Sequence, residues 1–140
     1  MTMTDTAPKS VSAEPGPMTG VVANLMLSDA KAAAQFYQRA FGAEELRRLA
    51  DPKGRIMHCH VRINGGSLIF NDAFPDNGHP AVPHQGYNIT LPVSDVDSWW
   101  GKAIAAGAEP VMAPAVMFWG DRYAQLRDPF GVLWALVGPA

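Results

Sequence analysis

The apolar and polar positions of this chain follow the same order twice, at an offset of about 65 residues. Each copy opens with an apolar, strand-like run, at residues 21–27 and 87–93. A Ser-Asp pair then begins a stretch with apolar residues at helical spacing, and a Gly-Ala-Glu sequence ends it. We therefore expect a duplicated module of strand, helix and further strands, with a small-molecule cleft between the two copies.

The first copy spans residues 19–73, and its helix is expected to begin at Ser28 or Asp29 and to end at Gly42. Three more strands are expected after this helix, at residues 45–50, 56–63 and 67–71, with a turn at residues 51–54 between the first two. Alternation within the middle strand predicts one apolar face, made by Met57, Cys59, Val61 and Ile63. The opposite face is expected to carry the polar side chains His58, His60 and Arg62.

The second copy spans residues 86–140 and repeats this plan, with a helix from Ser94-Asp95 to Gly107. Three strands are expected after this helix, at residues 109–112, 123–127 and 133–137. A type I turn at residues 128–131 is expected to join the last two. Residues 74–85 hold three prolines and no periodic pattern, which predicts a linker between the copies. Residues 1–18 are poor in apolar side chains, so we expect a disordered tail ahead of a single domain at residues 19–140.

Composition excludes several classes of protein. The 140 residues are 48% apolar and 17% charged, as in an ordinary globular domain. A net charge of −2 without basic runs gives no signature of nucleic-acid binding, and no apolar stretch approaches the roughly 20 residues of a membrane span. Cys59 is the only cysteine, so no internal disulfide forms, and we expect a cytoplasmic protein.

Several motifs together resemble a known family. Phe36-Tyr37 stands late in the first helix, and residues 118–122 (Phe-Trp-Gly-Asp-Arg) are followed by residues 127–131 (Arg-Asp-Pro-Phe-Gly) and Trp134. With the strand and helix order, they resemble the vicinal oxygen chelate superfamily of glyoxalases, bleomycin resistance proteins and dioxygenases, and within it the PhnB-like branch. The resemblance implies an α+β fold in which two βαβββ modules form a curled mixed sheet around a concave cleft, usually in a homodimer.

The resemblance also implies where a metal would bind. Metal-dependent members take His, Gln or Glu ligands from the first and last strand of each module. The corresponding positions here carry Val22, Asn24, Phe70, Asn71, Asp72, Asn88 and Ala135. Alanine cannot coordinate a metal and asparagine is a poor ligand for transition metals, so we expect no metal cofactor at the inherited site. The alternative is a divalent metal held by His58, His60 and Asp72 in a lyase, isomerase or dioxygenase.

The leading functional hypothesis is binding of a small, partly aromatic organic molecule, for sequestration or resistance. The expected ligand-binding residues are Asn24, His58, His60, Asn71, Asn88, Trp119 and Tyr123. His58 and His60 either contact the ligand or line a polar cavity, and Trp119 either stacks on the ligand or plugs the end of the barrel. His79 and His84 in the linker are either solvated or part of a lid over the cleft.

Overall fold

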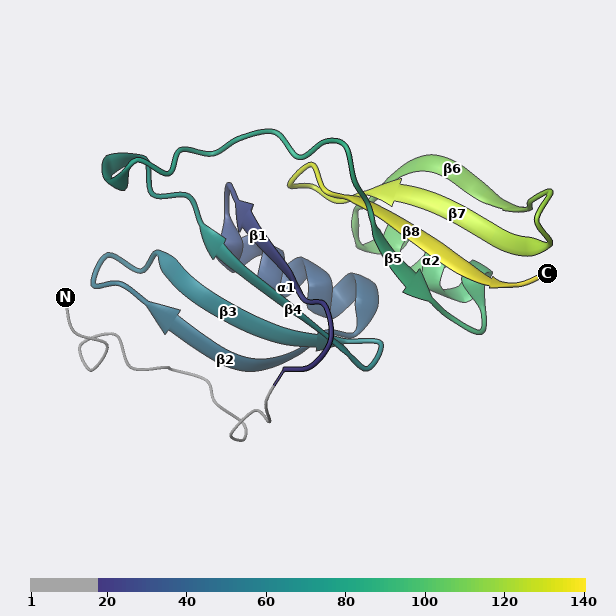
Figure 1. Ribbon diagram of the computed structural model, residues 1–140, viewed down its shortest axis with the longest axis horizontal. Helices are drawn as coiled ribbons and strands as arrows, with labels where there is room; N and C mark the ends of the chain where they lie inside the picture. Colours follow the sequence, from purple (N-terminus) through teal and green to yellow (C-terminus); the bar gives the residue numbers. More distant parts are fainter. Residues whose placement is uncertain (1–17) are drawn as a thin grey trace. The chain divides into compact units, whose positions relative to one another are not determined.

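Two α-helices and eight β-strands form the described part, residues 18–140, of the computed structural model (Figure 1). In chain order they are β1 (Ala23–Leu27), α1 (Ala30–Phe41), β2 (Glu44–Ala50), β3 (Ile56–Ile63), β4 (Gly66–Asp72), the 3-10 helix η2 (Pro75–Asn77), β5 (Ile89–Pro92), α2 (Val96–Ala106), β6 (Glu109–Val116), β7 (Asp121–Arg127) and β8 (Leu133–Pro139). The order β-α-β-β-β therefore occurs twice, which confirms the α+β fold of two βαβββ modules. The tail expected at residues 1–18 lies outside the described residues, except for Met18.

The chain divides into two compact units, each with its own four-stranded sheet. The first unit contains residues up to Gln38 and Ala43–Val82, and the second contains Arg39–Gly42 and Pro83–Ala140. The strand orders are β1-β4-β3-β2 and β5-β8-β7-β6. In each sheet the first pair is parallel and the other pairs are antiparallel, so the two sheets have the same topology.

The core of the first unit lies between α1 and one face of its sheet. Asp29 accepts a hydrogen bond from the Ala32 amide at 3.0 Å, and Gly42 ends the helix with a positive φ of 66°. The Tyr37 ring packs edge-on against the Phe70 ring, with centroids 5.6 Å apart. The predicted limits of this helix are thus confirmed.

The core of the second unit is organised in the same way around α2. Asp95 accepts a hydrogen bond from the Ser98 amide at 3.1 Å, and Gly107 ends the helix in the left-handed region. The buried side chains of this sheet include Leu91, Ala124, Leu126, Trp134 and Leu136. The expected turn at residues 128–131 is confirmed, because the Gly131 amide donates to the Asp128 carbonyl at 3.1 Å.

Strand β6 is longer than residues 109–112, the range expected from sequence. It continues to Val116, which pairs with Arg122 of β7, and residues 117–120 form the tight turn between them. Pro114 masked the second half of the strand in the sequence, since proline cannot donate a ladder hydrogen bond. An edge strand tolerates proline, and β6 lies at the edge of its sheet.

The expected place of Met57 was wrong. It was assigned to the apolar face with Cys59, but it is half-buried, while its neighbour Ile56 is 1% exposed. Leu49 pairs with His58 and Ala50 pairs with Ile56, so Met57 is the extra residue of a β-bulge. The bulge interrupts the alternation, and Ile56 rather than Met57 contributes to the core.

Candidate functional site

The register of the first sheet brings four of the expected ligand-binding residues onto one face. Asn24 pairs with Ile69, and Ile69 pairs with His60, so these three side chains lie in one row across the sheet. His58 lies two residues before His60 in β3 and Asn71 two residues after Ile69 in β4, so both share that face. This face is opposite to the one that carries Phe70 and Cys59.

The two histidines of this face have pKa values lowered from the ordinary value of 6.5. His60 is 3% exposed, and its Nε2 lies 2.8 Å from the Ser67 hydroxyl. Burial lowers the pKa of His60, and the nearby positive charge of Arg62 adds to the effect. Burial and the charge of Arg47 lower the pKa of the half-buried His58 in the same direction.

The other three expected residues belong to the second unit. The Trp119 ring lies edge-on to the Tyr123 ring at 5.6 Å, and the Tyr123 hydroxyl accepts a hydrogen bond from Gln125 at 3.0 Å. Asn88 accepts a hydrogen bond from the Thr90 hydroxyl at 2.6 Å. Trp119 itself stands in the tight turn between β6 and β7 and is 49% exposed.

The alternative metal site does not assemble. Both carboxylate oxygens of Asp72 accept backbone hydrogen bonds, from the amides of Ala30 and Ile56, each at 2.7 Å. Asp72 lies two residues beyond Phe70 in β4, on the face that packs against α1, so it points away from His58 and His60. Within residues 18–140, no three His, Cys, Asp or Glu side chains come together to hold a metal ion.

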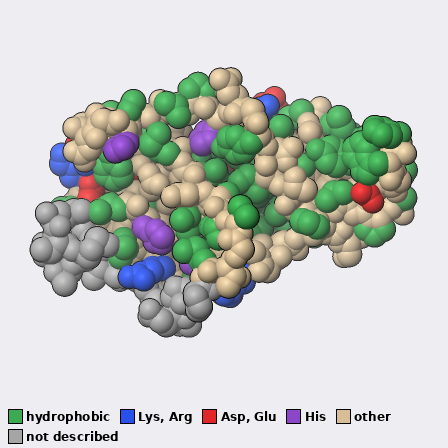
Figure 2. Space-filling model, in the orientation of Figure 1, with side chains coloured by type: hydrophobic (Ala, Val, Ile, Leu, Met, Phe, Trp, Pro, Cys, Tyr) green, Lys and Arg blue, Asp and Glu red, His purple; other side chains and the backbone are tan. Residues whose placement is uncertain are grey.

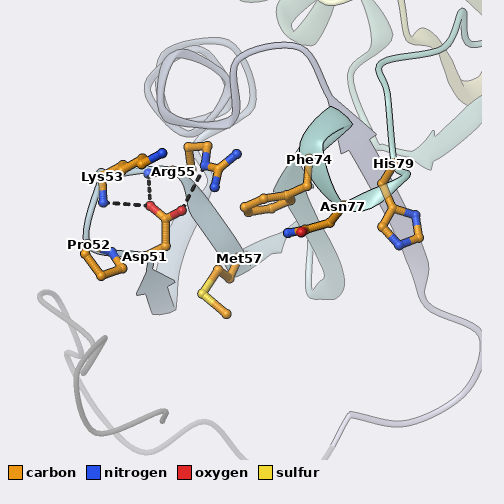
Figure 3. A pocket seen from close by; sticks show the side chains of 8 residues that line it. All are labelled: Asp51, Pro52, Lys53, Arg55, Met57, Phe74, Asn77 and His79. Carbon is orange, nitrogen blue, oxygen red and sulfur yellow. Dashed lines mark hydrogen bonds and ion pairs between the residues drawn. The ribbon is translucent and has the colours of Figure 1, made fainter. Parts of the chain in front are cut away.

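A cavity of about 600 Å³ in the first unit was not predicted as a site (Figure 3). It lies beside the turn between β2 and β3 and the segment that follows β4. Its lining residues are Asp51, Pro52, Lys53, Arg55, Met57, Phe74, Asn77 and His79. Phe74 and Asn77 project toward Met57, Asp51 lies at the β2–β3 turn, and Arg55 lies between Asp51 and the Phe74 ring (Figure 3). The wall of this pocket is mainly apolar, and its charged groups are concentrated at one end.

Arg55 is the centre of the charged end of the pocket. Its Nε donates to Asp51 Oδ2 and its Nη1 donates to Asp76 Oδ1, both at 2.8 Å. Its guanidinium carbon lies 4.4 Å from the centroid of the Phe74 ring, a cation–π contact. Hydrogen bonds from Arg55 lower the pKa of Asp76, and they also lower the pKa of Asp51 against the opposing effect of burial.

The pocket was missed because one of its walls, with three of the eight lining residues, comes from a segment that looked like a featureless linker. Residues 75–77 form a 3-10 turn, and Phe74 and His79 exchange two backbone hydrogen bonds, at 2.7 and 2.9 Å. The sequence signal for this turn was Phe74-Pro75-Asp76, because Pro75 follows an aromatic residue and is the first residue of the 3-10 helix. Proline at the first helical position favours such a turn, but does not reveal what the turn covers.

The family model named Glyoxalase/Bleomycin resistance protein/Dioxygenase superfamily matches residues 21–136. The chain belongs to this superfamily. An uncharacterized protein of Mycobacterium bovis is 40% identical over 122 residues, which cover 83% of this chain and 80% of that protein. The crystal structure of TioX from Micromonospora sp. ML1 is 28% identical, with a TM-score of 0.69, over 87% of this chain and 99% of that one.

A PhnB protein from Bacillus cereus shares the fold, with 17% identity and a TM-score of 0.66 over 85% of this chain and 98% of that one. The comparison supports the resemblance to the PhnB-like branch at the level of fold. No helix within residues 18–140 has the length and hydropathy needed to cross a bilayer.

The positions where metal-dependent members of this superfamily carry ligands do not fit a metal here. Ala135 of β8 is fully buried and pairs with Thr90 of β5 and Gln125 of β7, so none of these three neighbouring positions carries a carboxylate. The Asn88 amide oxygen is engaged by Thr90, and Asp72 accepts two backbone amides on the α1 side of its sheet. With Ala135 unable to coordinate, Asn88 and Asp72 engaged in hydrogen bonds and Asn71 carrying an amide, these positions lack the three protein ligands of a catalytic metal site.

Proposed function

We propose that this protein binds a small, flat and largely apolar organic molecule in the pocket of its first unit, as a binding or sequestering member of its superfamily. The observation that carries the proposal is the pocket itself. Its volume of about 600 Å³ falls within the roughly 300–1,000 Å³ typical of small-molecule sites. Its wall combines the apolar surfaces of Met57, Phe74 and Pro52 with few polar groups, the usual composition of such sites.

The lining also suggests how the molecule is oriented. A flat ring would lie between Met57 and Phe74, since both thioethers and aromatic rings make favourable contacts with aromatic groups. A polar substituent would face the Asn77 amide or the Lys53 ammonium. The charges of Arg55, Asp51 and Asp76 are satisfied by one another, so they define the pocket's shape more than they demand a charged ligand.

A second candidate site for the same function lies within the first unit, on the sheet face that carries Asn24, His58, His60 and Asn71. Their shared face supports this site. The other residues expected from sequence, Asn88, Trp119 and Tyr123, belong to the second unit, where the Trp119 ring contacts the Tyr123 ring. A metal-dependent lyase, isomerase or dioxygenase remains the alternative function, and elemental analysis of protein purified without chelator distinguishes it.

Titration with N-phenyl-1-naphthylamine, a flat uncharged fluorophore, tests the proposal. We expect wild-type protein to bind it, and Phe74→Ala to weaken binding roughly tenfold through loss of an aromatic contact. Val82→Ala, which shortens an exposed apolar side chain of the first unit outside the pocket, is the control and leaves binding unchanged. If His58→Ala/His60→Ala abolishes binding while Phe74→Ala does not, the site is the second candidate.

Assembly and location complete the proposal. We propose a homodimer, supported by the exposed apolar side chains of β6 and the following turn, and a cytoplasmic protein. Figure 2 shows hydrophobic side chains gathered over the end of the second unit that carries this turn.

The thiol of Cys59 is fully buried, and burial raises its pKa to about 12, so it packs as a core residue and is not a reactive nucleophile.

A further inference from the structure

The segment from Phe74 to His79 is a closed loop with few ties to the rest of the first unit. Four of its hydrogen bonds are internal, between the backbones of Phe74 and His79, Phe74 and Asn77, and Pro75 and Gly78. Its base is fixed by the Ala73 amide, which donates to the Leu27 carbonyl at 3.1 Å. Three of its side chains, those of Phe74, Asn77 and His79, form one wall of the pocket.

One residue outside the loop contacts it at two points. Arg55, on the turn that leads into β3, pairs with Asp76 at 2.8 Å and lies over the Phe74 ring at 4.4 Å. The same guanidinium pairs with Asp51 at 2.8 Å, and Asp51 also accepts the amides of Lys53 and Arg55 itself. Arg55 thus joins the β2–β3 turn, which Asp51 closes by hydrogen bonds, to the Phe74–His79 loop (Figure 3).

We propose that Arg55 is a positioning residue of this pocket, a latch that holds the Phe74–His79 loop over a bound molecule through Asp76 and Phe74. The inference rests on the proposed function, because it assumes that the pocket is the binding site. It adds that affinity depends on a group that need not touch the ligand. A latch made of one partly exposed ion pair and one ring contact is weak enough to open for ligand entry.

The two carboxylates that Arg55 contacts allow the latch to be separated from the turn. The Asp51 side chain is 8% exposed and organises the β2–β3 turn, so its loss would disturb the local fold. The Asp76 side chain is 56% exposed and belongs to the loop. Asp76→Asn therefore removes the charge of the latch and leaves the turn intact. Glu44→Gln, which removes the exposed Arg62–Glu44 ion pair of the same sheet, is the matched control.

The first measurement is amide hydrogen exchange of full-length protein without ligand. We expect Asp76→Asn to speed exchange at Phe74, Asn77, Gly78 and His79 by about threefold, the size expected from loss of an exposed ion pair. Exchange in β3 and β4 stays unchanged. Asp76→Glu restores protection because the carboxylate is kept, and Glu44→Gln has no effect on these amides.

The second measurement is the affinity for N-phenyl-1-naphthylamine at low and high salt. Wild-type affinity is expected to fall as salt screens the Arg55–Asp76 pair, although the probe carries no charge. Asp76→Asn weakens binding about threefold and removes the salt dependence. Arg55→Lys also weakens binding, since an ammonium cannot hold two carboxylates and stack on a ring at once.

The outcomes separate the two proposals. If wild-type protein fails to bind the probe, the pocket is not the binding site, and hydrogen exchange in Asp76→Asn still decides whether the latch exists. If the probe binds but Asp76→Asn matches wild type in exchange, affinity and salt dependence, Arg55 does not position the loop and the latch is overturned.

Discussion

The indole Nε1–H of Trp134 donates a hydrogen bond to Asp128 Oδ2 at 2.9 Å, and both side chains are buried in the second unit. The other carboxylate oxygen of Asp128 accepts the amides of Phe130 and Val132, each at 2.9 Å. One buried carboxylate therefore fixes the turn between β7 and β8 and orients the largest side chain of the core. Such a carboxylate is tolerated because each of its charge-assisted bonds offsets part of the desolvation cost.

Replacement of Asp128 by alanine should destabilise the protein strongly. The substitution breaks three hydrogen bonds to a charged group and leaves the buried indole N–H unpaired, so we expect a loss of about 3–5 kcal/mol in the free energy of unfolding. Urea denaturation followed by tryptophan fluorescence measures it. Asp29→Ala, which removes an exposed cap with one such bond, is the control and costs about 1 kcal/mol. Equal losses in the two variants would contradict the structural role assigned to Asp128.

Stability should decrease in mild acid because of His58 and His60. Both pKa values are lowered from 6.5, so between the folded-state pKa values and 6.5 the folded protein binds fewer protons than the unfolded chain. The stabilising contribution of the neutral rings is complete above pH 6.5 and is lost as the pH falls through the folded-state values. Thermal melts across this pH range should show a smaller decrease in the melting temperature of His58→Gln than of wild type. His79→Gln, in the loop, serves as the control and should follow wild type.

Added Ni²⁺, Zn²⁺ or Mn²⁺ should not raise the melting temperature. Ala135 and Asn88 occupy positions where superfamily members carry ligands, and Asp72 is engaged by backbone amides. A site of micromolar affinity at millimolar metal would add about 4 kcal/mol of stability, which is easily seen by calorimetry. A clear upward shift that disappears in Asp72→Ala would refute the expectation and favour the metal-dependent alternative.

The protein should sediment as a dimer, and the β6–β7 turn should contribute to the interface. Val116, Phe118 and Trp119 are 56%, 97% and 49% exposed, and the Phe118 and Trp119 rings contact each other, which leaves apolar surface in water at this turn. We expect Phe118→Ser with Trp119→Ser to shift the equilibrium toward the 15.0 kDa monomer in analytical ultracentrifugation. Val82→Ser, which changes an apolar residue 54% exposed in the first unit, is the control. A wild-type protein that is monomeric at tens of micromolar would exclude this assembly.

Sequence patterns predicted the elements well where short-range rules decide the structure. Asp29, Asp95, Gly42 and Gly107 cap helices through local hydrogen bonds and backbone conformation, so their roles can be recognised from neighbouring residues. The turn at residues 128–131 is of the same kind. Strand alternation also placed His58 and His60 on one face, as the sheet register has them.

The pocket could not be predicted because long-range contacts create it. Arg55 meets Asp76 across 21 positions of the chain, and no local pattern signals that pairing. The bulge at Met57 depends on the register between β2 and β3, which alternation within one strand does not define. Asp72 was expected as the third ligand of the alternative metal site, yet its carboxylate accepts the amides of Ala30 in α1 and Ile56 in β3.

The two prolines of β6 have a consequence for how this protein behaves at high concentration. An exposed, apolar edge strand is an ordinary starting point for fibril growth, because a second chain can extend the sheet. Pro110 and Pro114 carry no amide hydrogen, and the register of β6 shifts on either side of Met112. A second strand that paired with β6 would have an interrupted ladder of backbone hydrogen bonds. This edge can therefore form apolar side-chain contacts without serving as a template for amyloid.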